Sequence, residues 1–311
     1  MTRNEKITAA LLVAALAAAG CSKDKTSQTR DQESQRSAKA LPVSLTKPAG
    51  DKPIDVTVPK LAGPVSYADG EAAYQAGKYV EATQVFEQYT LDKPNNPWGH
   101  FMLGLSESKV GNPEKAEKAF EEALRIDPDH LKSLLNLSRM LIDERRFDDA
   151  IVKLGRAGEV EPNSAEVHRL LGRAYNGQHK TDDAIAAYRQ AIVLDPTDAW
   201  SMNNLGLILI QKGRANEATP FLAKAVELKK GEPTFHNNLA MALEQTGRFK
   251  AAVTEYNGAL AADPGNEKAK RNLARVEAVK TGSEEPFDRE AEAKHAIEVK
   301  QPASDSVIVV R

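Results

Sequence analysis

Five asparagines in the central and C-terminal parts of the chain could bind a peptide backbone. They stand in the stretches LLNLS, MNNLG and HNNLA, as Asn136, Asn203, Asn204, Asn237 and Asn238. A carboxamide offers a pair of N–H donors and a carbonyl acceptor, so a row of such groups can hold an extended polypeptide whatever its side chains. The competing interpretation is that asparagine simply suits a solvated helix face.

Basic side chains fall among the same asparagines. They are Lys132, Arg139, Arg169 and Arg173. The forked guanidinium group suits carboxylates, so this set predicts a site for acidic groups of a partner. The alternative is exposed charge balanced by nearby acids, because Asp, Glu, Lys and Arg make up 28% of the chain.

Residues of the same type recur through the whole central region at a constant interval, which is the step from Pro94 to Pro128, with no insertion between copies. Prolines recur at this interval as Pro94, Pro128, Pro162 and Pro196, with Pro264 two steps further on. One register of alanines comprises Ala82, Ala116, Ala150, Ala184, Ala218 and Ala252. A second register comprises Ala123, Ala157, Ala191, Ala225 and Ala259. Internal repetition at about 20 to 50 residues indicates a solenoid made of copies of one small unit.

Each unit is predicted to contain two helices of about 12 to 14 residues, because apolar residues recur at helical spacing in two stretches. In the fourth unit Gly177 interrupts the pattern between them. The proline follows the second helix and stops it, since proline lacks an amide donor.

Small residues recur inside the units as well. With Gly63 as position 1, positions 8 and 20 hold small residues, which allow a close helix crossing. Arg139 and Arg173 share position 9 in adjacent units, so they should lie one helix pair apart. One pair of helices cannot bury its own apolar face, so stability must come from stacked neighbours.

These residues resemble the tetratricopeptide repeat (TPR). The fourth unit matches the family pattern best, with Leu171, Gly172, Tyr175, Ala184, Tyr188, Ala191 and Pro196. The resemblance covers six units, at residues 63–96, 97–130, 131–164, 165–198, 199–232 and 233–266. It implies an all-α fold, a right-handed α-solenoid. A polar capping helix is expected over 267–282, and a flexible tail over 283–311 in which residues 291–300 form a short helix.

The first helix of each TPR lines a concave surface that binds extended polypeptide, so the resemblance implies that the asparagines and arginines face a partner. The set does not reproduce the family's carboxylate clamp, which leaves recognition of a free C-terminus open. Trp98 and Phe101 occupy the same surface in the second unit and suit hydrophobic side chains of a partner. The alternative is that these aromatic residues cover the start of the solenoid.

No metal, cofactor or catalytic site is predicted. His100, His168 and His236 share position 4 in alternate units, so neighbouring members lie roughly 20 Å apart at about 10 Å per helix layer. Zinc ligands lie about 2 Å from the ion, so these histidines are expected to pack between helices. The sequence contains no phosphate-binding loop, zinc-protease helix or Gly-x-Ser-x-Gly elbow, and we expect a protein that is not an enzyme.

The first residues resemble a bacterial lipoprotein signal. Arg3 and Lys6 precede an apolar run over residues 7–19, which is too short for a permanent membrane span. The run leads into the letters AAGC, similar to a lipobox, in which Cys21 is the only cysteine of the chain. The resemblance implies removal of residues 1–20, acylation of Cys21 and, because Ser22 follows, sorting to the outer membrane. A plain signal peptide with an incidental cysteine is the alternative.

Composition and charge indicate the character of residues 22–62 and exclude one class of partner. Residues 22–62 are polar and contain recurrent prolines, which predicts a disordered tether. The formal net charge is −2, so no basic field is available to hold nucleic acid.

We therefore expect a lipid-anchored protein on the periplasmic face of the outer membrane that acts as a scaffold for protein partners. Six repeats behind a lipobox resemble the pilotin lipoproteins of type IV pilus assembly. An adaptor that recruits peptidoglycan hydrolases or proteases is the alternative, and an enzyme is a remote third. The identity of the partner and the oligomeric state stay open.

Overall fold

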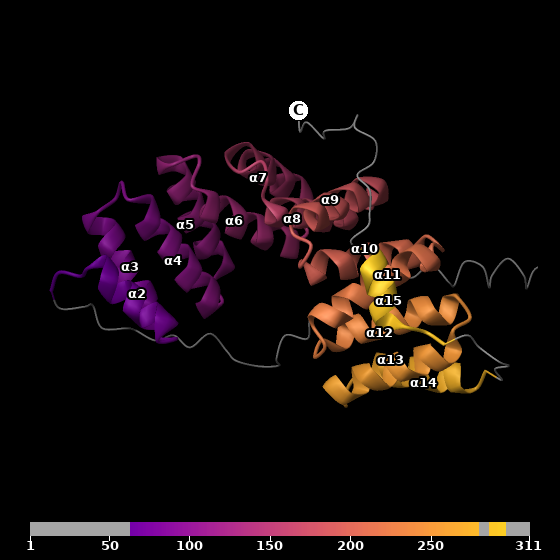
Figure 1. Cartoon of the computed structure of the whole chain (residues 1–311). Helices are drawn as coiled ribbons and strands as arrows, with labels where there is room; N and C mark the ends of the chain where they lie inside the picture. Colours follow the sequence, from indigo (N-terminus) through magenta and orange to yellow (C-terminus); the bar gives the residue numbers. More distant parts are fainter. Residues whose placement is uncertain (1–62, 280–285, 297–311) are drawn as a thin grey trace, which may run out of the picture. The chain divides into compact units, whose positions relative to one another are not determined.

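The computed structural model describes residues 63–279 and 286–296, and every regular element within them is an α-helix (Figure 1). This confirms the predicted all-α fold. The predictions for the signal, Cys21 and the tether fall outside the described residues. None of the helices in the described ranges has both the length and the apolar character needed to cross a bilayer.

The helices alternate between a first and a second helix in each of six units. The first helices are α2 (Tyr67–Gln75), α4 (Pro97–Val110), α6 (Leu131–Asp143), α8 (Ala165–Gly177), α10 (Ala199–Gln211) and α12 (Pro233–Gln245). The second helices are α3 (Tyr79–Asp92), α5 (Pro113–Ile126), α7 (Phe147–Val160), α9 (Thr181–Leu194), α11 (Ala215–Leu228) and α13 (Phe249–Ala262). After them come α14 (Glu267–Glu277) and α15 (Arg289–His295). Each second helix packs on its own first helix and on that of the next unit, so the units stack in chain order.

Small residues allow the two helices of each unit to touch, as the sequence predicts. In four units the glycine at position 8 faces the large side chain at position 24. A Cβ added to Gly172 would lie 2.7 Å from the ring of Tyr188, and one added to Gly206 would lie 2.4 Å from Cγ of Leu222. The alanines of both registers are fully buried. Because only small residues fit these crossings, the repeat period of the sequence reflects helix packing.

The turn inside each unit needs a left-handed residue at position 15. Glycine supplies it in four units, as Gly77, Gly111, Gly213 and Gly247. The third and fourth units use Arg145 and His179, with φ of 64° and 62°. Gly177, which was expected to interrupt the pattern between the two helices, is still helical and is the last residue of α8. Its missing side chain makes room for the ring of Phe147 instead.

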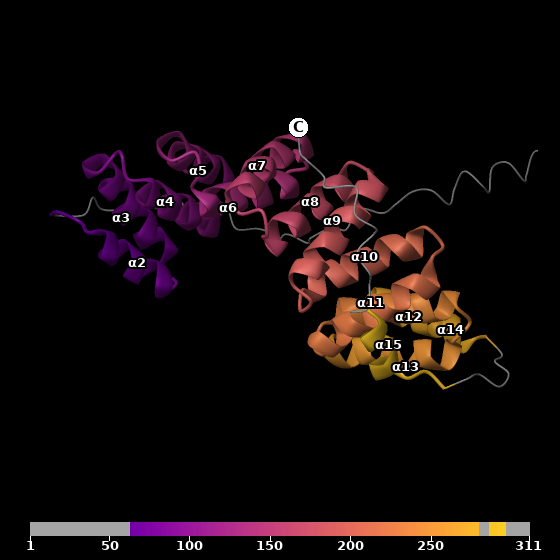
Figure 2. The same ribbon diagram turned by 45° about the horizontal axis from the view of Figure 1, so that its top comes forward.

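The helix α15 lies in the segment that was expected to be a flexible tail with a short helix over residues 291–300; it begins earlier, at Arg289, and it is packed rather than flexible. It packs against α11, and both views place it beside α11 and α13 (Figures 1 and 2). Ala293 and Ala296 are 0% and 1% exposed, so two small residues three positions apart let α15 approach closely. Arg289 donates to Glu255 of α13 at 3.0 Å, which fixes the start of the helix.

Candidate functional site

Three arginines of α6 and α8 lie together and form what we call the arginine cluster: Arg139, Arg169 and Arg173. Glu166 bridges two of them, since it forms an ion pair with Arg139 and lies 3.4 Å from Nη2 of Arg169. The third, Arg173, donates to Oδ1 of Asp143 on α6 at 2.7 Å. The first helices α6 and α8 contact each other, so the repeat register brings the three side chains to one place.

The guanidinium groups of the cluster are half-buried and repel one another. Burial lowers the pKa of Arg139, and the charges of Arg169 and Arg173 lower it further. The counter-ion of Arg173 is weakly held, because the side chain of Asp143 is 62% exposed. Exposed ion pairs contribute little to stability. The cluster can therefore exchange Asp143 for a carboxylate from outside the chain at small cost.

Tyr188 of α9 and Asn204 of α10 adjoin this cluster. The amide of Asn204 donates to the Tyr188 hydroxyl oxygen at 3.4 Å. Burial raises the pKa of Tyr188, while the charges of Arg173 and Arg169 oppose that rise. The hydroxyl therefore keeps its proton at neutral pH and can donate a hydrogen bond next to the arginines.

The asparagine row expected to hold a peptide backbone is mostly closed. Asn203, Asn237 and Asn238 are 3%, 3% and 2% exposed, so the prediction that they line an open surface is wrong for these three. The physical reason is that their amides bond to one another between neighbouring first helices. Asn136 and Asn204 are half-buried, and Asn136 accepts a hydrogen bond from Arg139 at 3.1 Å. These two remain candidates for partner binding beside the arginine cluster.

The closed asparagines belong to a continuous chain of hydrogen bonds inside the last units. Asn238 donates to Asn203 at 2.8 Å, and Asn272 of α14 donates to Asn237 at 3.1 Å. Each bond joins position 6 of one helix to position 5 of the preceding first helix. The chain runs in the order Arg275, Asn272, Asn237, Asn238, Asn203, Asn204 and Tyr188. Sequence reasoning missed Asn272, although it occupies the same register in the capping helix.

The two aromatic residues proposed for partner contact have different environments. Phe101 is 5% exposed and packs against the rings of Phe120 and His130, so its expected contact with a partner is wrong. Trp98 is 43% exposed, and Nζ of Lys132 lies 5.0 Å from the centre of its ring. Of these two residues, only the tryptophan is presented at the surface.

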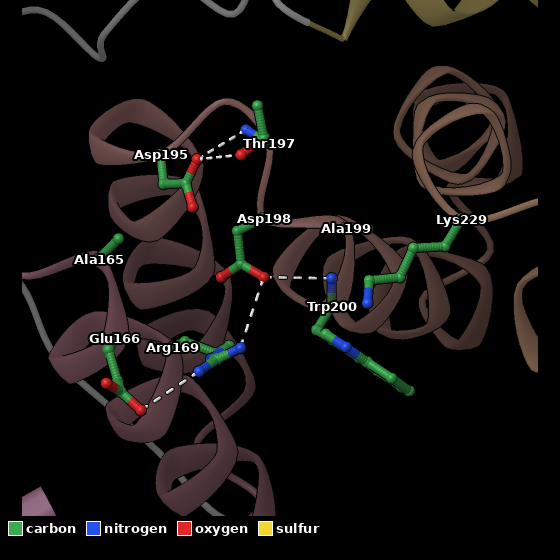
Figure 3. Close-up of a pocket in the computed structure, with 9 residues that line it drawn as sticks. All are labelled: Ala165, Glu166, Arg169, Asp195, Thr197, Asp198, Ala199, Trp200 and Lys229. Carbon is green, nitrogen blue, oxygen red and sulfur yellow. Dashed lines mark hydrogen bonds and ion pairs between the residues drawn. The ribbon is translucent and has the colours of Figure 1, made fainter. Parts of the chain in front are cut away.

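A pocket of about 370 Å³ opens beside the arginine cluster, at the N-terminal ends of α8 and α10 (Figure 3). Arg169 belongs to both features. The pocket is lined by Ala165, Glu166, Arg169, Asp195, Thr197, Asp198, Ala199, Trp200 and Lys229. We call it the tryptophan pocket, because Trp200 is its one aromatic residue and is 39% exposed. One side of the Trp200 ring contacts Phe235, with ring centroids 4.9 Å apart, and the rest of the ring is exposed.

The histidines serve helix packing, as predicted. Nε2 of His100 lies 2.9 Å from the carbonyl oxygen of Pro94, and His236 has the same contact with Lys230 at 2.9 Å. Burial lowers the pKa of His168, and a hydrogen bond with the backbone of Pro162 opposes this shift. Each ring therefore ties a first helix to the turn that precedes it. Within the described ranges no three His, Cys, Asp or Glu residues are grouped closely enough to hold a metal ion.

Among the solved structures, the likeness to one with a TM-score above 0.5 supports the fold. Cut9 with Hcn1, an APC/C hetero-tetramer, has a TM-score of 0.58 and 18% identity, covering 67% of this chain and 41% of that one. The MamA protein of Desulfovibrio magneticus RS-1, from residue 41 to its end, has a TM-score of 0.49 and 22% identity, covering 51% and 90%. YrrB, described as a TPR protein with an unusual peptide-binding site, has a TM-score of 0.49 and 15% identity, covering 61% and 97%.

Among curated proteins, no sequence is similar enough to count as a relative. Residues 58–305 match a family model described as the C-terminal domain of cilia and flagella-associated protein 70, a TPR domain. The match spans most of the chain and includes all six helix pairs, α14 and α15. The chain is thus a TPR protein and belongs to this family.

Proposed function

We propose that this chain is a lipid-anchored scaffold of the cell envelope that binds extended segments of partner proteins on the surface formed by α6, α8 and α10. The arginine cluster is the observation that carries the proposal. Three half-buried guanidinium groups stand together on first helices, and one of them is paired only with an exposed carboxylate. Guanidinium groups bind carboxylates in bidentate geometry, which fixes a partner's orientation as well as its position.

Two further polar groups support binding at the same surface. Asn136 contacts Arg139, and Asn204 contacts Tyr188, so amides lie on both sides of the cluster. Both side chains are only half-buried, which leaves part of their hydrogen-bonding capacity to a partner's backbone. An acidic side chain on the arginines and backbone contacts beside it form one extended site.

The lipid anchor is proposed from the sequence around Cys21. An acylated cysteine followed by a polar tether would hold the repeats at a membrane while letting them reach away from it. We favour a role in assembling an envelope complex, as in the pilotin-like lipoproteins. The long stretch between Cys21 and the first unit also favours an adaptor that brings peptidoglycan hydrolases or proteases to their place of work.

Replacing Arg173 by alanine is expected to weaken partner binding about tenfold, which corresponds to about 1.4 kcal/mol. The reason is that its guanidinium leaves the cluster while the helix surface stays intact. The full-length protein would be crosslinked in envelope membranes, and the captured partner quantified by mass spectrometry. Arg156→Ala is the matched control, because Arg156 forms comparable exposed ion pairs on the second helix α7. Equal loss in both variants, or none in Arg173→Ala, would count against the arginine cluster.

Replacing Cys21 by serine is expected to abolish lipid attachment. In a bacterial host fed an alkyne-tagged fatty acid, the wild-type chain should carry the tag and sediment with membranes. The Cys21→Ser chain should be untagged and should appear in the non-membrane fraction, because serine offers no thiol to acylate. Ser22→Ala should remain tagged and serves as the control. A wild-type chain without the tag would overturn the proposed lipid anchor. It would not bear on the proposed binding surface.

A further inference from the structure

The tryptophan pocket contains hydrogen-bond donors that no other residue in the described ranges uses. Nζ of Lys229 lies 5.8 Å from the centre of the Trp200 ring. In the part of the chain that the structure describes, Lys229 has no carboxylate within ion-pair distance, and the indole N–H of Trp200 has no acceptor. Figure 3 shows the lysine side chain descending toward the exposed indole. A cation over the partly exposed ring and the N–H group of the ring itself are thus both available to a ligand.

The acids of the pocket are already engaged. Glu166 is held by two guanidinium groups of the arginine cluster. Asp198 is 8% exposed and accepts from the hydroxyl of Ser201 at 2.6 Å and from backbone amides at the start of α10. One oxygen of Asp195 accepts both the amide and the hydroxyl of Thr197, which leaves its other oxygen as the main acceptor open to a ligand. The lining has three acids and two bases, so it is not basic as a whole, but Glu166 and Asp198 are paired with Arg169 and held by hydrogen bonds. Lys229 is the cation of the lining that has no ion-pair partner among the described residues.

The second exposed tryptophan also has a lysine over its ring, although that lysine comes from a different repeat position. Trp98 and Trp200 both occupy position 2 of a unit, in the first turn of α4 and α10, and both are about two-fifths exposed. Lys132 stands over Trp98 as Lys229 stands over Trp200, and Lys132 also lacks a carboxylate within ion-pair distance among the described residues. Two first helices, α4 and α10, thus present a partly exposed indole in their first turn. Over each indole lies a lysine that has no ion-pair partner among the described residues.

We propose that the tryptophan pocket binds an acidic side chain next to an apolar one in the partner segment. The carboxylate would pair with Lys229, and the neighbouring apolar side chain would cover the Trp200 ring. Because Arg169 lines both sites, the segment would continue from this pocket onto the arginine cluster. The inference rests on the proposed binding of extended segments and adds the chemistry that selects them.

The first test selects peptides without assuming their sequence. A library of random peptides displayed on phage would be enriched on the full-length protein and, in parallel, on its Lys229→Ala and Trp200→Ala variants. The wild type is expected to enrich Asp or Glu beside an aromatic or aliphatic residue, and both variants are expected to lose that enrichment. Peptides that bind all three proteins equally would overturn the proposed role of the tryptophan pocket but would be consistent with the proposed function. Failure of the wild type to enrich any peptide would overturn both.

The second test measures affinity at the pocket. Trp98→Phe leaves Trp200 as the single tryptophan, so indole fluorescence then reports this site alone. Titration with the enriched peptide should give binding that is at least tenfold weaker when its acid is changed to Gln or when Lys229 is changed to Ala. Lys230→Ala is the matched control, because Lys230 is the adjacent exposed lysine and does not line the pocket. Stronger binding of a lysine-bearing peptide than of the acidic one would show that the open oxygen of Asp195 dominates, and would overturn the proposal.

Discussion

Alanine in place of Gly206 is expected to destabilise the protein by about 2 kcal/mol, whereas alanine in place of Gly158 is expected to stabilise it by about 0.5–1 kcal/mol. The added Cβ at Gly206 would lie 2.4 Å from Cγ of Leu222, which is fully buried and has no room to move. The helices α10 and α11 would have to separate. At Gly158 the nearest atom, on Val167, is 3.7 Å away, an ordinary contact, so only the gain in helix propensity remains.

Urea unfolding of the two variants and the wild type, followed by circular dichroism, checks this pair. Both changes replace glycine by alanine within a helix, so a difference in sign isolates the crossing contact from propensity. Hydrogen exchange should also show faster opening of α10 and α11 in Gly206→Ala, because each unit contacts mainly its neighbours. Two variants that shift stability in the same direction would refute the close crossing at position 8.

The contacts within one unit are the part of the fold that the sequence predicts well. Gly172 and Tyr188 belong to the two helices of one unit, and their contact recurs in other units, so the constraint appears as a period in the sequence. The same holds for the fully buried alanines. Because the same packing constraint acts in unit after unit, the same type of residue recurs several times in one chain. Chance is therefore excluded as the cause of the pattern.

The side-chain environment at the predicted binding surface was less accessible to sequence reasoning. The asparagines at positions 5 and 6 were correctly placed on first helices, but the direction of an amide depends on which residue the next unit presents. Asn203 is buried because Asn238 reaches it from the following unit. Phe101 is buried for a similar reason, since His130 and Phe120 close over it. Helical periodicity gives the face of a helix and not the neighbour that covers it.

Features whose residues do not recur at the same repeat positions leave no period to detect. The tryptophan pocket needs Lys229 from the end of α11 beside Trp200 from the start of α10, and no other unit repeats that pair at the same positions. The docking of α15 joins residues near the C-terminus to α11, about two units earlier in the chain. The sequence indicates a short helix over residues 291–300, but the two alanines that make the contact do not indicate which helix it packs against.

A buried ion network under α15 gives the second large effect. Glu255 is 4% exposed, and its two oxygens lie 2.7 Å from Nδ1 of His236 and 3.0 Å from Nη1 of Arg289. The other ring nitrogen of His236 faces the carbonyl oxygen of Lys230. A carboxylate and a carbonyl can only accept, so the ring satisfies both contacts when both of its nitrogens are protonated. Glu255 thus holds two cations, one on each side.

Glu255→Ala is expected to lower the free energy of unfolding by about 3 kcal/mol, because it leaves His236 and Arg289 without their buried counter-ion. The loss stays at the lower end of the usual range, since the side chain of Arg289 is 35% exposed and can turn to water. Limited proteolysis should also cut more readily next to α15. Glu292→Ala is the control, because its pair with Arg248 is partly exposed. An exposed pair of this kind should contribute about 0.5 kcal/mol.

The pH dependence separates the charge of this network from simple loss of packing. The hydrogen bond to Glu255 raises the pKa of His236 above its ordinary value, which is about 6.5. Protonated histidine therefore stabilises the folded state fully below about pH 6.5, and this contribution is lost as the pH rises through the raised pKa. Wild-type stability should fall over that interval, and the Glu255→Ala variant should not show this fall. A wild-type profile that is flat there would mean that His236 is neutral and that Glu255 acts through Arg289 alone.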